Sequence, residues 1–293
     1  MMADEDRGTY VVTGATSGIG QWVARGLVER GHRLIGVGRS AERCATTLHD
    51  FEEVGGEGRV EICLADLSLQ SEVRRLAVEV GAVLERWGIH GLDGLVNNAG
   101  TFSFWQTLTP EGFEMQWAVN HLAPFLLTHQ LLPRLRSATS ARVVTVSSGS
   151  HYGAKLNWED LQLQRRYNPL RAYEQTKLAN VAFTAELNRR LGSQSSVQAF
   201  AADPGLVNTD IGEKAHSRLA GWVWTVRRRS GIEPQEAAEG ILKVLLDHSL
   251  ETSQGMYWKH GAPKAPNPYA LEPAVGRRLW EVSSQMCGLL EGA

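Results

Sequence analysis

Tyr173 and Lys177 are the two residues of this sequence best placed to move a proton, because they stand four positions apart. In the helix that the pattern predicts over residues 171–191, side chains at this spacing lie on one face. A tyrosine is a poor base near neutral pH, since its reference pKa is about 10, but a neighbouring ammonium group lowers that pKa. The pair therefore predicts general acid/base chemistry, and an ordinary helix surface is the alternative.

A glycine-rich segment follows the first apolar run and reads Thr13-Gly14-Ala15-Thr16-Ser17-Gly18-Ile19-Gly20. We expect Gly14 to permit a tight turn, Gly18 to let backbone N–H groups approach a pyrophosphate, and Gly20 to let a helix pack on the sheet. The start of that helix presents its positive end to phosphate groups. The segment therefore predicts a dinucleotide site, and a glycine turn without a ligand is the alternative.

The elements that must position these residues alternate between apolar runs and helical patterns. The runs are mostly continuous, which is typical of strands covered on both faces. Strands are expected over Thr9–Thr13, Arg33–Val37, Val60–Leu64, Gly94–Asn97, Arg142–Ser147, Val197–Ala202 and Gly255–Trp258. Helices are expected over 19–30, 40–54, 71–87, 110–136, 171–191 and 234–248, with Thr109-Pro110 and Glu233-Pro234 marking two of the starts. This order predicts a single doubly wound, Rossmann-type α/β domain over residues 1–293, with a mainly parallel sheet of about seven strands flanked by helices.

Composition limits the function classes further. The 293 residues are 43% hydrophobic and 21% charged, which excludes a disordered or fibrous chain. The formal net charge of −2 gives no basic field, so we expect no nucleic-acid partner. Three scattered cysteines form neither a disulfide framework nor a metal-ligand pattern. The acidic start lacks a signal-peptide core and no apolar run approaches about 18 residues, so a cytoplasmic protein without a transmembrane segment is expected.

Three motifs in register resemble the short-chain dehydrogenase/reductase family: TGATSGIG at 13–20, NNAG at Asn97–Gly100 and YEQTK at Tyr173–Lys177. The resemblance implies hydride transfer between a nicotinamide cofactor and a carbonyl carbon, with Tyr173 as general acid/base and Lys177 also holding the nicotinamide ribose. It implies that Ser148, rather than Ser147, orients the substrate oxygen, and a serine that only stabilises a turn is the alternative. It further implies that Asn120 distorts a long helix and supports a water relay to the lysine.

The end of the second predicted strand bears on the choice of cofactor. Gly38 occupies the position where the family's NAD-dependent members place an acid, and Arg39 follows it. An arginine there would make charge-assisted bonds to a 2′-phosphate, so NADP(H) is expected, and a surface arginine at a helix start is the alternative. By resemblance the cofactor site also takes in Thr16, Ser17, Ile19, Ser40, Asp66, Leu67, Asn97, Ala99, Gly100, Pro204, Gly205, Val207 and Thr209. A capping or turn role for Asp66, and a purely structural turn at 203–209, are the alternatives.

The segments after Ser148 resemble the retinol-dehydrogenase-like branch of the family, through Ser150-His151-Tyr152, Leu156–Leu161 and DPGLVNTD. The branch implies an apolar alcohol or carbonyl substrate, such as a retinoid, a steroid or a prenyl compound. Besides Ser148, the candidate substrate contacts are Tyr152, Trp105, Leu206 and Trp222, with Phe102, Phe104 and Trp224 as further apolar groups. We expect a helical substrate lid at 205–231, and ordinary core or lid packing is the alternative for each aromatic residue. His151 is expected to have a positioning or surface role.

For two further segments, the sequence does not decide what they contact. The predicted C-terminal helix at 274–291 places Val275, Leu279, Val282, Met286 and Leu289 on one face, which either packs on the parent sheet or forms a homo-oligomer contact. The segment Trp222–Arg229 either belongs to the lid, which we favour, or lies at a bilayer surface. Two other functions stay open as well: reduction of an activated C=C bond, and a non-catalytic NADP(H)-sensing protein.

Overall fold

A computed structural model describes residues 7–207, 232–250 and 255–289 of the chain. They form an eight-stranded sheet in the order β3-β2-β1-β4-β5-β6-β7-β8, and every neighbouring pair is parallel except β7 and β8. The strands are β1 (Thr9–Thr13), β2 (Arg33–Gly38), β3 (Val60–Leu64), β4 (Gly94–Asn97), β5 (Ala141–Val146), β6 (Val197–Asp203), β7 (Tyr257–Lys259) and β8 (Ala262–Pro263). The single Rossmann-type α/β architecture predicted from the sequence is confirmed.

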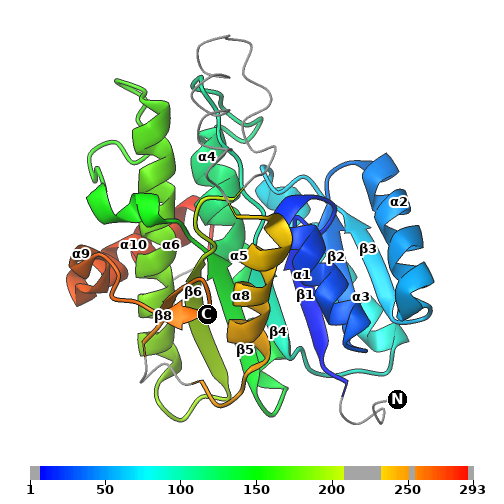
Figure 1. The fold of residues 1–293 in the computed structure, drawn as a ribbon. Helices are drawn as coiled ribbons and strands as arrows, with labels where there is room; N and C mark the ends of the chain where they lie inside the picture. Colours follow the sequence, from blue (N-terminus) through cyan, green and yellow to red (C-terminus); the bar gives the residue numbers. More distant parts are fainter. Residues whose placement is uncertain (1–6, 208–231, 251–254, 290–293) are drawn as a thin grey trace.

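Helices cover both faces of the sheet (Figure 1). The α-helices are α1 (Gly18–Glu29), α2 (Ala41–Phe51), α3 (Gln70–Arg86), α4 (Met115–Trp117), α5 (Ala123–Arg136), α6 (Pro169–Leu191), α8 (Pro234–Leu246), α9 (Pro268–Leu271) and α10 (Pro273–Met286). Three tighter or wider turns complete them: η2 (Glu52–Gly56) and η3 (Ala118–Leu122) are π-type, and η4 (Gly149–Gly153) is a 3₁₀ turn. Helices α1 and α8 pack together on one face, while α3, α5 and α6 lie on the other, where α10 packs against α6.

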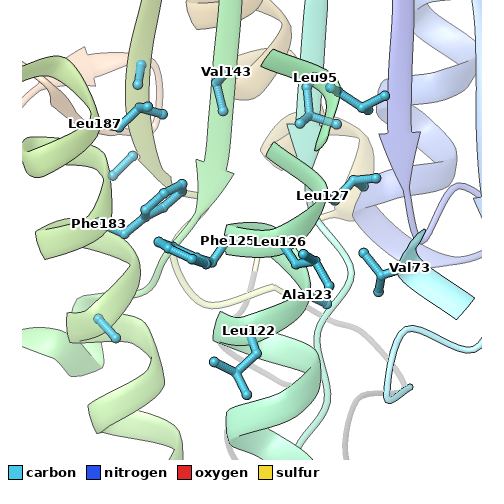
Figure 2. Close-up of a cluster of buried hydrophobic side chains, with 14 of the residues drawn as sticks. Val73, Leu95, Leu122, Ala123, Phe125, Leu126, Leu127, Val143, Phe183 and Leu187 are labelled. Carbon is cyan, nitrogen blue, oxygen red and sulfur yellow. The ribbon is translucent and has the colours of Figure 1, made fainter. Parts of the chain in front are cut away.

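Two separate hydrophobic cores explain why the strands are continuously apolar. Successive residues of a strand point to opposite faces. Val11, Leu95 and Val143 accordingly enter the core beneath α3, α5 and α6, whereas their neighbours Val12, Val96 and Val144 enter the core beneath α1 and α8. Figure 2 shows the first of these cores, where Phe125 of α5 meets Phe183 of α6 edge-on, with ring centroids 5.5 Å apart. Both faces of the sheet are therefore buried, as the apolar runs predicted.

The predicted helix start at Thr109-Pro110 is wrong. Residues 108–114 form a tight turn instead, closed by a bridge between Leu108 and Glu114, and Gly112 adopts a φ of +84°. The helix begins at Met115, where the Glu114 side chain accepts a hydrogen bond from the Trp117 N–H (2.8 Å). The capping signature was present at Thr109, but the turn at Gly112 and the carboxylate cap at Glu114 overrode it.

At the other end of the chain, α10 begins one residue before the predicted helix 274–291 and ends at Met286, where Gly288 takes a φ of +59°. Val275 and Leu279 are buried in the α3/α5/α6 core, where α10 packs mainly against α6 and not directly on the sheet as predicted. The two-residue strand β8 was not predicted, because it is too short to produce a pattern. Residues 208–231 of the predicted lid, including Trp222 and Trp224, lie outside the described residues.

Two kinds of feature, a membrane-spanning helix and a metal-binding cluster, are absent from the described part of the chain. None of the helices within residues 7–207, 232–250 and 255–289 is long and apolar enough to cross a membrane. Among the same residues, no group of three or more His, Cys, Asp or Glu side chains is arranged to hold a metal ion.

Candidate active site

The predicted functional residues collect at the carboxyl ends of the parallel strands. Neighbouring strands β1 and β4 lie where the strand order reverses, since β2 and β3 follow β1 on one side and β5 follows β4 on the other. In open α/β sheets, ligands bind at this switch point. In Figure 1 this edge faces upward, above the arrowheads of β1, β4 and β5. The site is therefore built from the loops that leave β1, β2, β4, β5 and β6.

The loop between β1 and α1 has the geometry that a pyrophosphate cradle requires. Gly14 and Gly18 adopt φ values of +70° and +55°, which side chains rarely tolerate. A Cβ at Gly20 would lie 2.3 Å from the Gly14 carbonyl oxygen, so only glycine allows the helix to start this close to the loop. Ser17, the N-cap residue of α1, makes no side-chain cap hydrogen bond, which leaves the first-turn N–H groups without that partner. The residues present therefore fit a dinucleotide phosphate.

Thr13 and Asn98 tie this loop to the end of β4. The Thr13 hydroxyl accepts hydrogen bonds from the N–H groups of Asn98 and Ala99 (both 3.0 Å), and the Asn98 amide donates to the Thr13 carbonyl (2.9 Å). Asn97, predicted as a cofactor residue, instead donates its side-chain amide to Thr128 (2.9 Å) inside the fold. Sequence reasoning gave Thr13 no role, whereas it expected the second asparagine of NNAG, Asn98, to pair with backbone groups, as its hydrogen bond to the Thr13 carbonyl confirms. A backbone contact of Asn97 with the cofactor stays a prediction.

At the end of β2, the packing leaves no room for an acidic side chain at position 38. A Cβ on Gly38 would lie 2.5 Å from Cγ2 of Thr16 and 2.7 Å from Sγ of Cys44. Arg39 is exposed, and it has no ion-pair partner within the described part of the chain. A cavity of about 380 Å³ lies between α1 and α2, lined by Thr16, Gln21, Glu42, Arg43, Thr46, Thr47 and Asp50. Arg43, which sequence reasoning missed, brings a second guanidinium to this end of the site.

Two predicted cofactor residues have side chains engaged in local caps. The Ser40 hydroxyl accepts a hydrogen bond from the Arg43 N–H (3.4 Å) at the start of α2. One oxygen of Asp66 accepts from the Ser68 N–H (2.9 Å), which is the turn role left open from the sequence. Leu67, next to Asp66, is partly buried against the core. Contacts of these three residues with an adenine ribose stay predictions.

Tyr173 and Lys177 lie one turn apart on α6, and they do not form an ordinary helix surface. Lys177 is only 4% exposed, and its ammonium group donates to the Val146 carbonyl of β5 (3.0 Å). Its Nζ lies 5.5 Å from the centroid of the Tyr173 ring. Burial lowers the pKa of Lys177 to about 8, and the Asp203 carboxylate opposes that shift. The structure thus places a buried amine that titrates just above neutral pH beside the tyrosine.

The two serines after β5 differ in what they contact. The Ser147 hydroxyl is buried and donates to the Lys177 carbonyl (2.9 Å), so it braces α6 against the sheet. Ser148 is half-buried, caps η4, and accepts a hydrogen bond from the Ser150 N–H (3.3 Å) through its hydroxyl. Ser148 is therefore the serine of the pair that remains able to meet a substrate oxygen.

His151 is held on both sides by backbone groups that settle its tautomer. Its Nδ1 lies 2.7 Å from the Ser148 carbonyl oxygen, which can only accept, and its Nε2 lies 3.1 Å from the Asn267 N–H, which can only donate. The neutral ring must therefore carry its proton on Nδ1. Burial lowers the pKa of His151, and its ring packs at a tilt against Tyr152 and Tyr257 at centroid distances of 4.1 and 4.8 Å. The positioning role left open from the sequence is the one that these contacts favour.

Asn120 joins two walls of the site from the π-type turn η3. Its Oδ1 accepts from the Thr101 N–H (2.7 Å), and its amide donates to the Thr101 carbonyl (2.9 Å) and to the Thr176 hydroxyl on α6 (3.2 Å). A Cβ on Gly100 would lie 3.5 Å from Asn120 Oδ1 and 3.7 Å from Lys177 Nζ, so these three positions meet. The helix distortion implied by the resemblance is present at η3, and the water relay stays a prediction.

The loop after β6 turns at Gly205, as Pro204-Gly205 suggested. Gly205 has a φ of +82°, and a Cβ there would lie 2.2 Å from the His260 ring. Val207 forms a parallel bridge with Ile232, where the described chain resumes. Thr209, predicted to meet the nicotinamide carboxamide, lies outside the described residues.

The predicted substrate residues are only partly brought together. Trp105 and Leu206 are 72% and 55% exposed, and the Tyr152 hydroxyl donates to the Ala265 carbonyl (2.8 Å). Phe102 instead lies edge-on to Tyr173, with ring centroids 5.7 Å apart, and Phe104 lies 5.0 Å from Phe102. The apolar surface beside the tyrosine is therefore formed by two phenylalanines that the sequence marked only as further candidates.

Comparisons with known proteins agree with this geometry. The family model described as short chain dehydrogenase matches residues 9–220. Human retinol dehydrogenase 11 is 34% identical over 95% of this chain and 85% of its own length, and human retinol dehydrogenase 13 is 35% identical over 96% and 85%. Bovine dehydrogenase/reductase SDR family member 13 is 35% identical over 97% of this chain and 74% of its own length.

Solved structures show the same fold. A crystal structure of an uncharacterized protein from Mycobacterium paratuberculosis has a TM-score of 0.74 at 33% identity, covering 98% of this chain and 97% of that one. The landomycin C-6 ketoreductase LanV, solved with bound NADP and rabelomycin, has a TM-score of 0.64 at 26% identity, covering 86% and 94%. The chain therefore belongs to the short-chain dehydrogenase/reductase family of oxidoreductases, in the branch of the retinol dehydrogenases.

Proposed function

We propose that the protein is an NADP(H)-dependent oxidoreductase that transfers a hydride between the nicotinamide and the carbonyl or alcohol carbon of an apolar substrate. The observation that carries this proposal is the buried Lys177 ammonium beside the Tyr173 ring, at the sheet edge that also holds the glycine cradle. Such an arrangement has no use in a surface helix, but it suits a tyrosine that must exchange a proton near neutral pH.

Each site residue has a defined task in this reaction. Tyr173 donates a proton to the carbonyl oxygen in reduction and accepts one from the alcohol in oxidation. Ser148 donates a hydrogen bond to the same oxygen, which orients the carbon toward the cofactor face. Lys177 stabilises the developing phenolate, and Asn120 keeps Gly100 and α6 at a fixed separation. The bound nicotinamide supplies or accepts the hydride.

The proposed preference for NADP(H) over NAD(H) is supported by the packing at the end of β2. An acid that would bind the ribose hydroxyls of NAD has no space at Gly38. Arg39, exposed and without an ion-pair partner among the described residues, is available to bind a 2′-phosphate, and Arg43 lines the adjoining cavity. Titration with both cofactors tests this, since tighter binding of NADH than of NADPH would refute it.

An apolar substrate is supported by Phe102 next to Tyr173, by Phe104 packed on Phe102, and by the branch to which the chain belongs. The candidates are retinoid, steroid and prenyl alcohols or carbonyl compounds. The test is an NADPH-oxidation screen over retinals, ketosteroids, prenals, quinones and small aldehydes. An alcohol as product supports the proposal, whereas a saturated carbonyl compound would show C=C reduction instead.

The matched control for Tyr173 is Tyr269, a tyrosine on α9. Tyr173→Phe should reduce turnover at least about a thousandfold while NADPH still binds, because only the acidic hydroxyl is lost. Tyr269→Phe removes a hydroxyl that accepts from the Trp158 indole (2.9 Å), and it should keep near-normal turnover. Turnover by Tyr173→Phe close to that of the wild type would refute the assignment, and binding of NADPH without turnover on any substrate would favour a sensing protein.

A further inference from the structure

Asp203 is a fully buried carboxylate at the end of β6, with a side-chain exposure of 0%. One of its oxygens accepts from the Gly205 N–H (2.9 Å), and the other accepts from the Tyr257 hydroxyl (2.8 Å). The Lys259 ammonium lies 3.7 Å from that second oxygen. Two donors and a nearby cation stabilise the ionised form of the carboxylate. A negative charge is thus built into the interior directly behind the candidate site.

The same carboxylate lies close to the residues that surround Lys177. Val146, whose carbonyl accepts from the Lys177 ammonium, pairs in register with Ala202, the residue before Asp203. A Cβ on Gly149 would lie 3.4 Å from Asp203 Oδ2, which places the carboxylate against the segment that follows Ser148. Asp203 at the end of β6 and the Lys177 ammonium, which reaches from α6 to the end of β5, therefore lie at neighbouring strand ends of the same edge.

The buried ammonium group of Lys177 needs a negative charge nearby to stay protonated. Within the described residues its ammonium has a carbonyl partner but no direct ion pair, and a buried charge without a counter-charge is strongly disfavoured. We propose that Asp203 is the counter-charge that keeps Lys177 protonated beside Tyr173, acting through the field between two strand ends and not through a direct salt bridge. The inference rests on the proposed function only for the role of Lys177 in proton transfer.

The other titratable groups around the pair do not supply a negative charge. His151 of η4 and His121 of η3 are neutral because burial lowers the pKa of each, to about 3 in the case of His121. Burial raises the pKa of Tyr257, which stays a neutral donor. Lys259 on β7 and Lys264 after β8 are cations. Among the groups named here, Asp203 is therefore the one that carries a negative charge, and that charge raises the pKa of Lys177 against the effect of burial.

Lys259 acts against Asp203 in this arrangement. Its ammonium lies 3.7 Å from the Asp203 carboxylate, but one third of its side chain is exposed, so water screens its charge in part. Removing the charge of Asp203 should lower the pKa of Lys177, and removing the charge of Lys259 should raise it. These opposite signs separate an electrostatic role from a purely structural one, since loosened packing would not reverse with the sign of the deleted charge.

The test is a direct titration of Lys177 in the protein without cofactor or substrate. The chain has only six lysines, so the ¹³Cε resonances of lysine-labelled protein can be resolved and assigned with Lys177→Arg. The wild-type midpoint is expected at about 8. In Asp203→Asn, which keeps the shape and an acceptor for the Gly205 N–H, it should fall by about 1 pH unit or more. The matched control is Asp93→Asn at the opposite end of the sheet, which removes an acid that accepts from the Thr9 N–H and should leave the midpoint unchanged.

Lys259→Met gives the second arm, with a rise in the Lys177 midpoint as the expected result. A folded Asp203→Asn protein with an unchanged midpoint would overturn the inference. If Asp203→Asn does not fold, an unchanged or lowered midpoint in Lys259→Met would overturn it. Because the titration needs no turnover, a protein that shifts as expected but reduces no substrate would refute the proposed function alone. In an active protein, the alkaline limb of the pH–rate profile should move with the Lys177 midpoint in each variant.

Discussion

From the burial of His121 we predict that the folded protein loses stability at mildly acidic pH. Its ring is fully buried in η3, 2.8 Å from the Ser283 hydroxyl of α10 and 4.7 Å from the Trp117 ring. Burial lowers its pKa from 6.5 to about 3, so the folded protein keeps it neutral while the unfolded chain protonates it below pH 6.5. Stability is therefore full above about pH 6.5 and falls by about 1.4 kcal/mol per pH unit below it, until the folded pKa is reached.

Between pH 7 and pH 5 this single residue should remove about 2 kcal/mol from the free energy of unfolding. The assay is urea unfolding at both pH values for the wild type and for His121→Gln, which stays neutral and can still bond to Ser283. The variant should lose about 2 kcal/mol less than the wild type over that range. His49→Gln, at a side chain that is 72% exposed, is the control and should follow the wild type. Parallel losses in wild type and His121→Gln would refute the reasoning.

Three further substitutions test the cofactor and catalytic ends of the site. Arg39→Ser should weaken NADPH binding about tenfold or more and leave NADH binding unchanged in a fluorescence titration, whereas equal losses for both cofactors would contradict a 2′-phosphate contact. Gly20→Ala should lower the free energy of unfolding by at least about 1 kcal/mol and impair NADPH binding, because its Cβ would meet the Gly14 carbonyl, and an unchanged melting temperature would contradict this contact. His151→Phe removes the hydrogen bonds to the Ser148 carbonyl and the Asn267 N–H, so kcat should fall about tenfold with NADPH affinity retained, and an unaltered kcat would exclude a positioning role.

The fold was largely predictable from sequence because its signals are local. Each strand is an apolar run in which neighbours such as Val11 and Val12 enter opposite cores, and the pattern follows directly from that double burial. The helix start at Thr109-Pro110 failed because a local capping signature does not reveal that Gly112 turns the chain first. Strand β8 was not predicted, because two residues are too few to show the alternating pattern of a strand.

The site residues also divide into those that local sequence signals predict and those whose contacts depend on distant segments. Tyr173, Lys177 and the three loop glycines could be predicted, since helix spacing and turn geometry are properties of short segments. For His151 the sequence left a positioning and a surface role open, and for Asp203 only a place in the 203–209 turn, because their partners come from distant parts of the chain: the Asn267 N–H that meets His151 is 116 residues away. The solvent exposure of a side chain also depends on segments that are distant in the sequence, as the exposed Trp105 and the buried Lys177 show.

Hydride transfer to a carbonyl carbon is the central claim, and its most direct test follows a label. The purified protein is mixed with NADPH deuterated at C4 of the nicotinamide and with each carbonyl compound that the screen identifies, and the product is analysed by mass spectrometry and NMR. We predict one deuterium on the carbinol carbon, delivered from one face of the nicotinamide, and loss of this transfer in Tyr173→Phe. Deuterium at the β-carbon of a saturated product, no deuterium in the product, or undiminished transfer by Tyr173→Phe would contradict the claim.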